Sequence, residues 1–219
     1  EDTRSSRIGQ TDDRIDTATT GRIHGAGLRV YKGTNSVYVH TNDTSDAGLM
    51  ALAERAADAV DSVRGEDRQI QLSGSIVKNI HEIRELPMDV SGERRRALVR
   101  EACRAARAES AEIAHVTGAL WDWEQAVTIA NTEGMFVSDQ RVYTRASVTA
   151  VASGNGENQT GSESPGAMMG FELFSTREDM NARAREAARR AVTMLHADKC
   201  PAGVMPVVID GGFGGVIFH

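Results

Sequence analysis

The chain has 219 residues, with 31 acidic and 25 basic side chains and a formal net charge of −6. Hydrophobic residues make up 40% of the composition and charged residues 26%, which is typical of a globular protein with a buried core and excludes a disordered chain. No apolar run approaches the roughly 20 residues that a membrane span needs, and the acidic balance argues against a nucleic-acid-binding protein of the usual basic kind. Cys103 and Cys200 are too few for a disulfide scaffold, so we expect a cytoplasmic location.

The first forty residues alternate apolar and polar side chains with a period of two, as half-buried strands do. Leu28 and Val30 show this spacing, and so do Val37 and Val39. Residues 32–35 between them, Lys-Gly-Thr-Asn, are typical of a hairpin turn. We therefore predict an antiparallel meander over residues 4–41.

Three later segments change to helical spacing. The first helix is predicted to begin with an N-cap at residues 44–46 and to end at Gly65, and the second to open at Ser91. The third is predicted to be capped by Ser175 or Thr176. The expected buried stripes are Leu49, Leu52, Ala53, Ala56, Val60 and Val63 in the first helix, Val99, Ala102, Cys103 and Ala106 in the second, and Met180, Ala184, Ala187, Ala191 and Met194 in the third.

Strand signals lie between these helices. A short strand is predicted near residues 70–72, and several strands are predicted between residues 111 and 152, with turns at residues 131–134 and 138–140. Because strands and helices interleave irregularly and not as βαβ repeats, the predicted fold class is α+β. We expect an antiparallel or mixed β-sheet with three main helices packed on it.

The rest of the second half is rich in glycine. Residues 153–166 are polar and glycine-rich, which predicts a mobile loop. A buried strand is predicted at residues 205–209, and the glycines of residues 211–215 are expected to serve a tight turn or close packing. These glycines match neither phosphate-binding fingerprint, because no Lys-Ser/Thr follows them.

Two further features have both a functional and a structural interpretation. Trp121 and Trp123 flank Asp122 in a strand-like segment, so both rings are expected on one face, where a binding surface is possible and packing is commoner. The second helix carries a basic stripe that could contact nucleic acid, although nearby glutamates and the acidic total favour a solvated face. The stripe consists of Arg96, Arg100, Arg104 and Arg107.

The C-terminal stretch closely resembles a known family. Residues 200–209 read Cys-Pro-Ala-Gly-Val-Met-Pro-Val-Val-Ile, and residues 215–219 read Gly-Val-Ile-Phe-His. This order resembles the lead-in to the metal motif of the TldD/PmbA family, the "modulator of DNA gyrase" metalloproteases. Residues 25–33 are similar to the family's early glycine-rich hairpin. The resemblance spans most of the chain, and its specific part lies in residues 200–219.

The resemblance implies an N-terminal α+β domain over residues 1–201 and the start of a metalloprotease domain over residues 202–219. His219 matches the first histidine of the family's His-Glu-x-x-x-His motif, which is a zinc ligand in the family. The glutamate that acts as general base, the second histidine and a distant cysteine ligand have no counterpart in this sequence. We therefore expect a piece of a longer TldD-type zinc metalloprotease, with no catalytic residue within the chain and no activity on its own.

The resemblance also implies partners. Catalytic members resemble peptidases of unfolded or extended peptides, working as a homodimer or as a heterodimer with a PmbA/TldE-like paralogue that lacks the motif. A noncatalytic partner subunit or peptide-binding module is the alternative function. A nucleic-acid-associated regulator is a third interpretation, supported here only by the arginine stripe. No membrane partner is expected.

Overall fold

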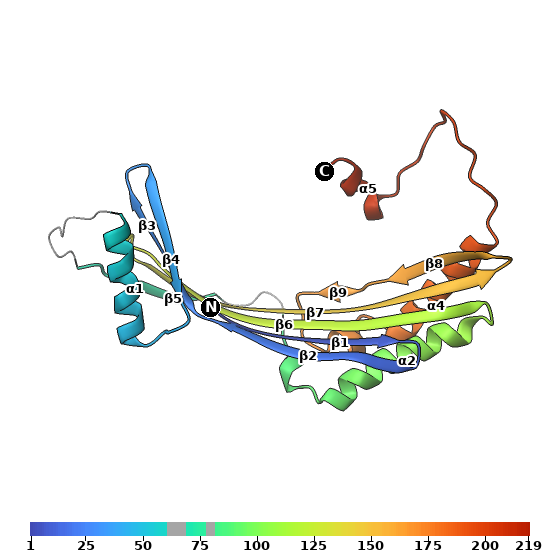
Figure 1. Ribbon diagram of the computed structural model, residues 1–219, viewed down its shortest axis with the longest axis horizontal. Coiled ribbons are helices and arrows are strands. Elements are labelled where there is room, and N and C mark those ends of the chain that lie inside the picture. The colour runs from blue at the N-terminus through green and yellow to red at the C-terminus, as the bar shows by residue number, and fades with distance from the viewer. Residues whose placement is uncertain (61–68, 78–81) are drawn as a thin grey trace.

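A computed structural model describes residues 1–60, 69–77 and 82–219, and its fold is α+β, as predicted. One long, curved β-sheet forms the body of the molecule (Figure 1). Its strands lie in the order β2-β1-β6-β7-β5, and β8 and β9 also pair with β7. The strands are β1 (Asp2–Thr11), β2 (Arg14–His24), β5 (Ser73–Ile76), β6 (Ile113–Ala130), β7 (Met135–Gly154), β8 (Glu157–Glu163) and β9 (Gly166–Ala167).

Two helices, α2 (Gly92–Glu109) and α4 (Met180–Leu195), cover one face of this sheet. The Ser91 hydroxyl caps α2 by accepting a hydrogen bond from the Arg94 N–H at 3.2 Å, as the sequence predicts. The predicted stripe of α2 is buried. In α4 the small side chains of Ala184, Ala187 and Ala191 are fully buried and allow close approach to the sheet, whereas Met194 of the predicted stripe is 51% exposed. The core is therefore a single layer between the helices and the sheet.

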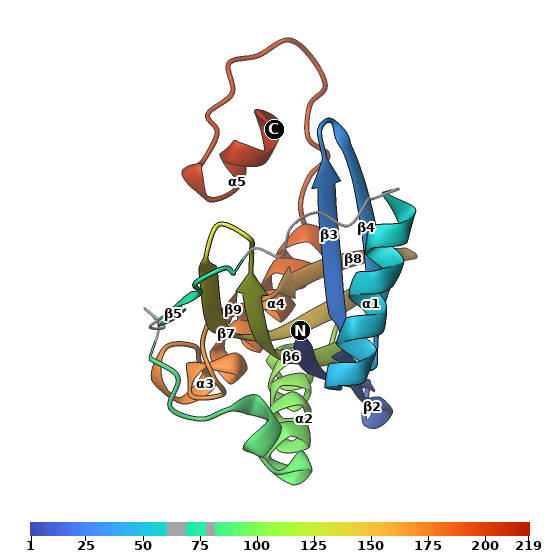
Figure 2. The same ribbon diagram turned by 90° about the vertical axis from the view of Figure 1, so that its left-hand side faces the viewer.

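Within the described residues, no helix packs against the opposite face of the sheet, which Figure 2 shows from one end. Along β6 and β7 the even-numbered residues from Val116 to Asp122 and from Val142 to Ala152 are buried against the helices, and the odd-numbered ones alternate with them. We call the face that carries these odd-numbered side chains the open face. This one-sided burial is common in antiparallel sheets.

A smaller unit follows β2 in the chain. Strands β3 (Ala26–Lys32) and β4 (Asn35–Thr41) form a separate two-stranded sheet, against which α1 (Asp46–Ala59) packs. The predicted meander is therefore divided into two antiparallel hairpins, β1–β2 and β3–β4. Ser45 caps α1 as predicted, and the predicted end at Gly65 lies outside the described residues.

One predicted break in the strands is wrong, and one predicted strand is shifted. Residues 138–140 form no turn, because β7 continues through them in register with β6, from Ser138 opposite Thr128 to Gln140 opposite Ala126. Pairing along both strands outweighs the local turn signal of these polar residues. The short strand predicted near residues 70–72 lies slightly later, as β5, and pairs in parallel with the start of β7.

The prediction of a mobile loop over residues 153–166 is also wrong. Most of this segment is strand β8, which pairs antiparallel with β7 through a tight turn at Asn155 and Gly156, both with positive φ. Its polar composition reflects an edge strand that is exposed on one side. Only Gly161 is buried, against the backbone of α4.

The last predicted elements also differ from the structure. The third main helix is α4, and it begins after Asp179, whose carboxylate accepts from the N–H groups of Asn181 and Ala182. Ser175 and Thr176 instead belong to a short preceding helix, α3 (Leu173–Thr176). Residues 205–209 are exposed and form no strand, and the glycine cluster lies in a short helix, α5 (Gly211–Ile217). A short 3-10 helix (Pro87–Asp89) precedes α2.

Candidate functional site

The predicted metal ligand His219 lies at the end of the C-terminal segment. Residues 199–210 are exposed and without regular structure, and they lead into α5, after which the His219 N–H donates to the Val216 carbonyl at 3.3 Å. In both views this segment lies on the side of the sheet opposite α2 and α4 (Figures 1 and 2). His219 is thus an exposed imidazole on the side of the open face.

The residues that the structure describes do not by themselves form a zinc site. Within residues 1–60, 69–77 and 82–219 no three His, Cys, Asp or Glu side chains come close enough to hold a metal ion. Zinc sites in proteins use at least three protein ligands. A single exposed imidazole therefore does not fit a resident zinc, and no catalytic step follows from these residues alone.

The most distinctive surface of the described structure is an aromatic and arginine cluster on the open face. Pairing across β1, β6 and β7 places Arg7, Trp121 and Arg145 in one row. The adjacent row consists of Ser5, Trp123 and Tyr143. We call these six residues the aromatic array. Both tryptophan rings share one face of β6, as the sequence predicts.

Two pairs of side chains in the aromatic array are in contact. The Trp123 and Tyr143 rings stack with centroids 4.5 Å apart and planes inclined by 22°. The Arg7 guanidinium lies 5.4 Å from the Trp121 ring centroid, within cation–π range. A hollow of about 390 Å³ lies over the β6–β7–β9 part of this surface. It is lined by Trp121, Trp123, Tyr143, Thr144, Arg145, Gly166, Ala167 and Met168.

The site also contains Arg7, Tyr143 and Arg145, which are not predicted from the sequence. A signal was present for two of them, since Tyr143 and Arg145 alternate with buried Val142, Thr144 and Ala146 in a strand with the same phase as the tryptophans. The pairing of β1 with β6, which brings in Arg7, joins segments that are far apart in the sequence and has no local signal.

Asp122, between the two tryptophans, points to the opposite side of β6. Its carboxylate accepts a hydrogen bond of 2.5 Å from Arg95 of α2, and both side chains are buried. Burial raises the pKa of Asp122, although Arg95 acts against this by favouring the charged form. The ion pair joins α2 to the strand that carries the tryptophans, so it supports the aromatic array from behind.

Three of the four arginines in the stripe of α2 contact neighbouring carboxylates or carbonyls. Arg96 lies 3.0 Å and Arg100 3.9 Å from Glu93. Arg107 pairs with Asp12 and donates to the carbonyls of Ile113 and Ala114. These contacts are those of a solvated, charged helix face.

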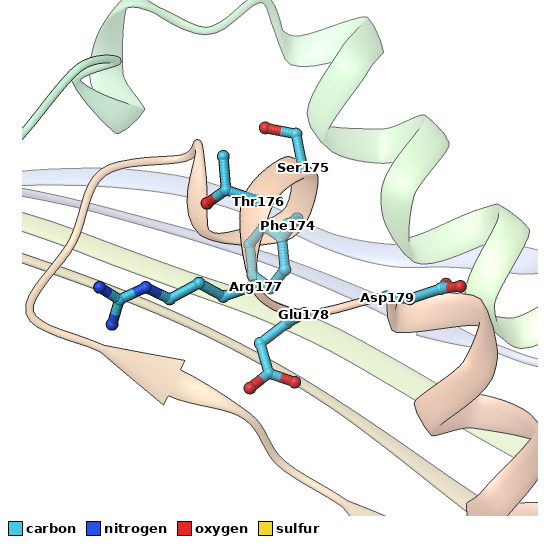
Figure 3. Close-up of a pocket in the computed structure, with 6 residues that line it drawn as sticks. All are labelled: Phe174, Ser175, Thr176, Arg177, Glu178 and Asp179. Carbon is cyan, nitrogen blue, oxygen red and sulfur yellow. The ribbon is translucent and has the colours of Figure 1, made fainter.

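A second hollow lies at the loop between α3 and α4, and Figure 3 shows the residues that line it. Its acidic groups already have structural partners: Asp179 caps α4, and Glu178 pairs with Arg183 at 2.9 Å. Both carboxylates that line this hollow are therefore engaged in structural contacts. It is a by-product of the helix cap.

Comparison with known proteins places the chain in a family. The family model described as "PmbA/TldA metallopeptidase central domain" matches residues 85–195, and "PmbA/TldA metallopeptidase domain 1" matches residues 1–60. A metalloprotease from Methanothermobacter thermautotrophicus is 29% identical over 99% of this chain and 46% of its own length. A metalloprotease TldD homologue from Haemophilus influenzae is 28% identical over 89% of this chain and 42% of its own. The chain spans less than half the length of these relatives.

Solved structures show the same fold. A protein from Thermotoga maritima, described as a modulator of a DNA gyrase, matches with a TM-score of 0.72 at 16% identity, over 92% of this chain and 45% of that one. TldE from Thermococcus kodakarensis matches with a TM-score of 0.62 at 14% identity, over 87% and 42%. The domain division at residue 201 stays a prediction. The domain matches and the shared fold together establish that this chain belongs to the TldD/PmbA family of metallopeptidases.

Proposed function

We propose that this chain is the N-terminal part of a TldD-like, zinc-dependent metallopeptidase of unfolded or extended peptides, and that the chain alone is inactive. The observation that supports the proposal is the run Gly215–His219, which resembles the lead-in to the family's metal motif, in a chain that belongs to this family. His219 contributes one metal ligand in the longer protein, and residues outside this sequence contribute the others. When bound, zinc would supply an activated water for peptide hydrolysis.

The role of the described residues is to enclose and position the peptide. The open face lies on the same side of the sheet as His219, so it is suited to form a wall beside the metal. The free edge of β2 can add an extended segment through main-chain hydrogen bonds, which tolerate many sequences. A homodimer, or a heterodimer with a PmbA/TldE-like paralogue, completes the enclosure in this proposal.

Metal content and peptide cleavage test the proposal directly. After dialysis, the longer protein is expected to retain stoichiometric zinc and to cleave casein or an unstructured peptide, whereas the 219-residue chain does neither. His219→Ala in the longer protein should abolish both properties, and His196→Ala serves as the control, because His196 pairs with Glu112 on the surface. Zinc retention and cleavage by the 219-residue chain would contradict the proposal.

A noncatalytic partner subunit is the second candidate. The likeness to TldE from Thermococcus kodakarensis supports it, since the fold alone does not separate the two types. The residues that follow His219 in the gene decide between them. His-Glu-x-x-x-His supports the peptidase, and its absence supports the partner subunit.

A further inference from the structure

We propose that the aromatic array is a docking site for acidic, aromatic segments of extended peptides. This inference rests on the proposed peptide-directed function and specifies which peptides the open face would hold. It adds a site that lies within the described residues and is separate from the predicted metal ligand.

The two arginines of the aromatic array provide the first half of the recognition. Among the residues that the structure describes, neither Arg7 nor Arg145 has a carboxylate within ion-pair distance, although most other arginines of the sheet and helices are paired. Both are exposed, and both stand on the open face beside Trp121. Two uncompensated positive charges in a chain of net charge −6 form a local site for a carboxylate-bearing ligand.

The aromatic rings provide the second half of the recognition. Trp123 is 37% exposed although it stacks on Tyr143, and Met168 borders the same hollow with 38% exposed. Flat rings and a flexible thioether at the edge of a hollow are suited to hold an aromatic side chain by stacking and sulfur–aromatic contact. A ligand that carries only charges would leave the apolar surface of these side chains exposed to water.

The register sets the spacing of the ligand. Arg7 and Arg145 lie on strands separated by one other strand, so their backbones are about 10 Å apart. An extended peptide advances about 3.3 Å per residue and presents every second side chain on one face, so carboxylates four residues apart lie about 13 Å apart on the same face, within reach of the two long arginine side chains. The segment that fits is therefore acidic–x–aromatic–x–acidic, lying across the strands with its aromatic side chain over Trp121, which stands between Arg7 and Arg145.

The chain supplies its own reporter for the test, because Trp121 and Trp123 are the only two tryptophans in the sequence. The probe is the peptide acetyl-Gly-Asp-Gly-Phe-Gly-Asp-Gly-amide, which contains no tryptophan. Titration into the 219-residue chain, and into the longer protein, should change the tryptophan emission in a saturable way. The matched peptide with Asn in place of both Asp residues should bind about fivefold more weakly at low salt, and added salt should reduce the difference.

Variants locate the site. Arg7→Gln combined with Arg145→Gln should remove the preference for the Asp peptide and leave the weak binding of the Asn peptide. Arg4→Gln is the control, because Arg4 is exposed on the same strand but points to the other face. Tyr143→Ala should weaken both peptides, while an unchanged unfolding transition shows that the variant is folded.

Several outcomes would overturn the proposal. They are equal binding of the Asp and Asn peptides, tighter binding of a ten-residue oligothymidylate, and binding by the 219-residue chain but not by the longer protein. Emission that changes with protein concentration alone would indicate a second copy on this surface and would also contradict it. Because the readout is binding, a longer protein that binds the Asp peptide but cleaves nothing would refute the proposed peptidase and leave this site standing.

Discussion

At the scale of single residues, the pair Arg95–Asp122 shows how a buried charge is held in this fold. Asp122 Oδ1 and Arg95 Nε have no hydrogen-bond partner within the described part of the chain, so the pair is only partly satisfied. A buried pair of this kind adds little net stability, but breaking it leaves one charge unpaired in the core.

Asp122→Ala is therefore expected to lower the free energy of unfolding by about 3–5 kcal/mol, because the Arg95 guanidinium stays buried without its carboxylate. The double variant Arg95→Met with Asp122→Leu should recover most of this loss, since it removes both charges. Urea unfolding measures each value, and Arg96→Ala on the exposed face of α2 is the control. A double variant as unstable as the single one would show that the ion pair itself is needed.

Cys103 gives a second prediction at this scale. Burial in the core raises the pKa of its thiol from 9.0 to about 12. In the unfolded chain the thiol ionises first, so the free energy of unfolding should fall as the pH rises from about 9 to about 12. Cys103→Ala should remove this part of the pH dependence in urea unfolding.

Thiol reactivity checks the same feature independently. At about pH 8 a disulfide reagent should react rapidly with exposed Cys200 and with Cys103 only after unfolding, because the thiolate is the reactive form. Cys200→Ser should abolish the rapid reaction. Rapid reaction of both thiols in the folded chain would contradict the buried position of Cys103.

At the scale of elements, the contact between β8 and α4 depends on one glycine. A Cβ at Gly161 would collide with the Ala187 carbonyl and lie 2.7 Å from the Ala191 N, and neither backbone atom can move aside as a side chain could. Gly161→Ala is expected to cost about 3 kcal/mol of unfolding free energy, through separation of α4 from the sheet edge. Gly203→Ala, where a Cβ meets nothing within 4 Å, should have no effect in the same assay.

The element boundaries show what the sequence could predict. Caps and apolar stripes are local, so the starts of α1 and α2 and the buried faces of α2 and α4 follow from a few neighbouring residues. Strand β8 could not be recognised, because its polar side chains are explained only by its position at the sheet edge beside α4. The exposed run at residues 205–209 has the composition of a core strand, but nothing in the described structure covers it.

The candidate site also contains residues that local sequence predicts and residues that it does not. The shared face of Trp121 and Trp123 follows from their spacing of two, whereas Arg7 joins them through pairing between distant strands. His219 is predicted from its resemblance to a motif, and no neighbouring residue in the described part of the chain completes a site around it. In the proposed function the other ligands lie outside this sequence, so no residue within it indicates them.

At the scale of the whole molecule, the C-terminal segment contributes little to the folded core. Val207, Val208 and Phe218 are 73%, 98% and 84% exposed, so they gain almost nothing from burial. Removal of residues 199–219 is expected to change the free energy of unfolding by less than about 0.5 kcal/mol. It should also reduce self-association measured by light scattering, because these apolar side chains are then absent. A large loss of stability would show that the segment packs on the sheet.

The described part of the chain contains no helix that is both long enough and apolar enough to span a membrane. The long strands β6 and β7 connect the two ends of the sheet. They run from the helix-covered region to the end of the sheet where β5 pairs, as Figure 1 shows.

The central position of β1 has a consequence for how the protein is made. On the ribosome β1 can pair at once with β2, but its other edge must wait for β6, since even its nearest partner, Thr117 opposite Thr11, is synthesised much later. During that interval the nascent hairpin exposes two unpaired edges, which are templates for pairing with other chains. Closing so long a loop is also slow, because its entropy is lost before any contact between β1 and β6 forms. From this strand order we expect β1–β6 pairing to limit the rate of refolding. We also expect chaperones to protect the nascent β1–β2 hairpin.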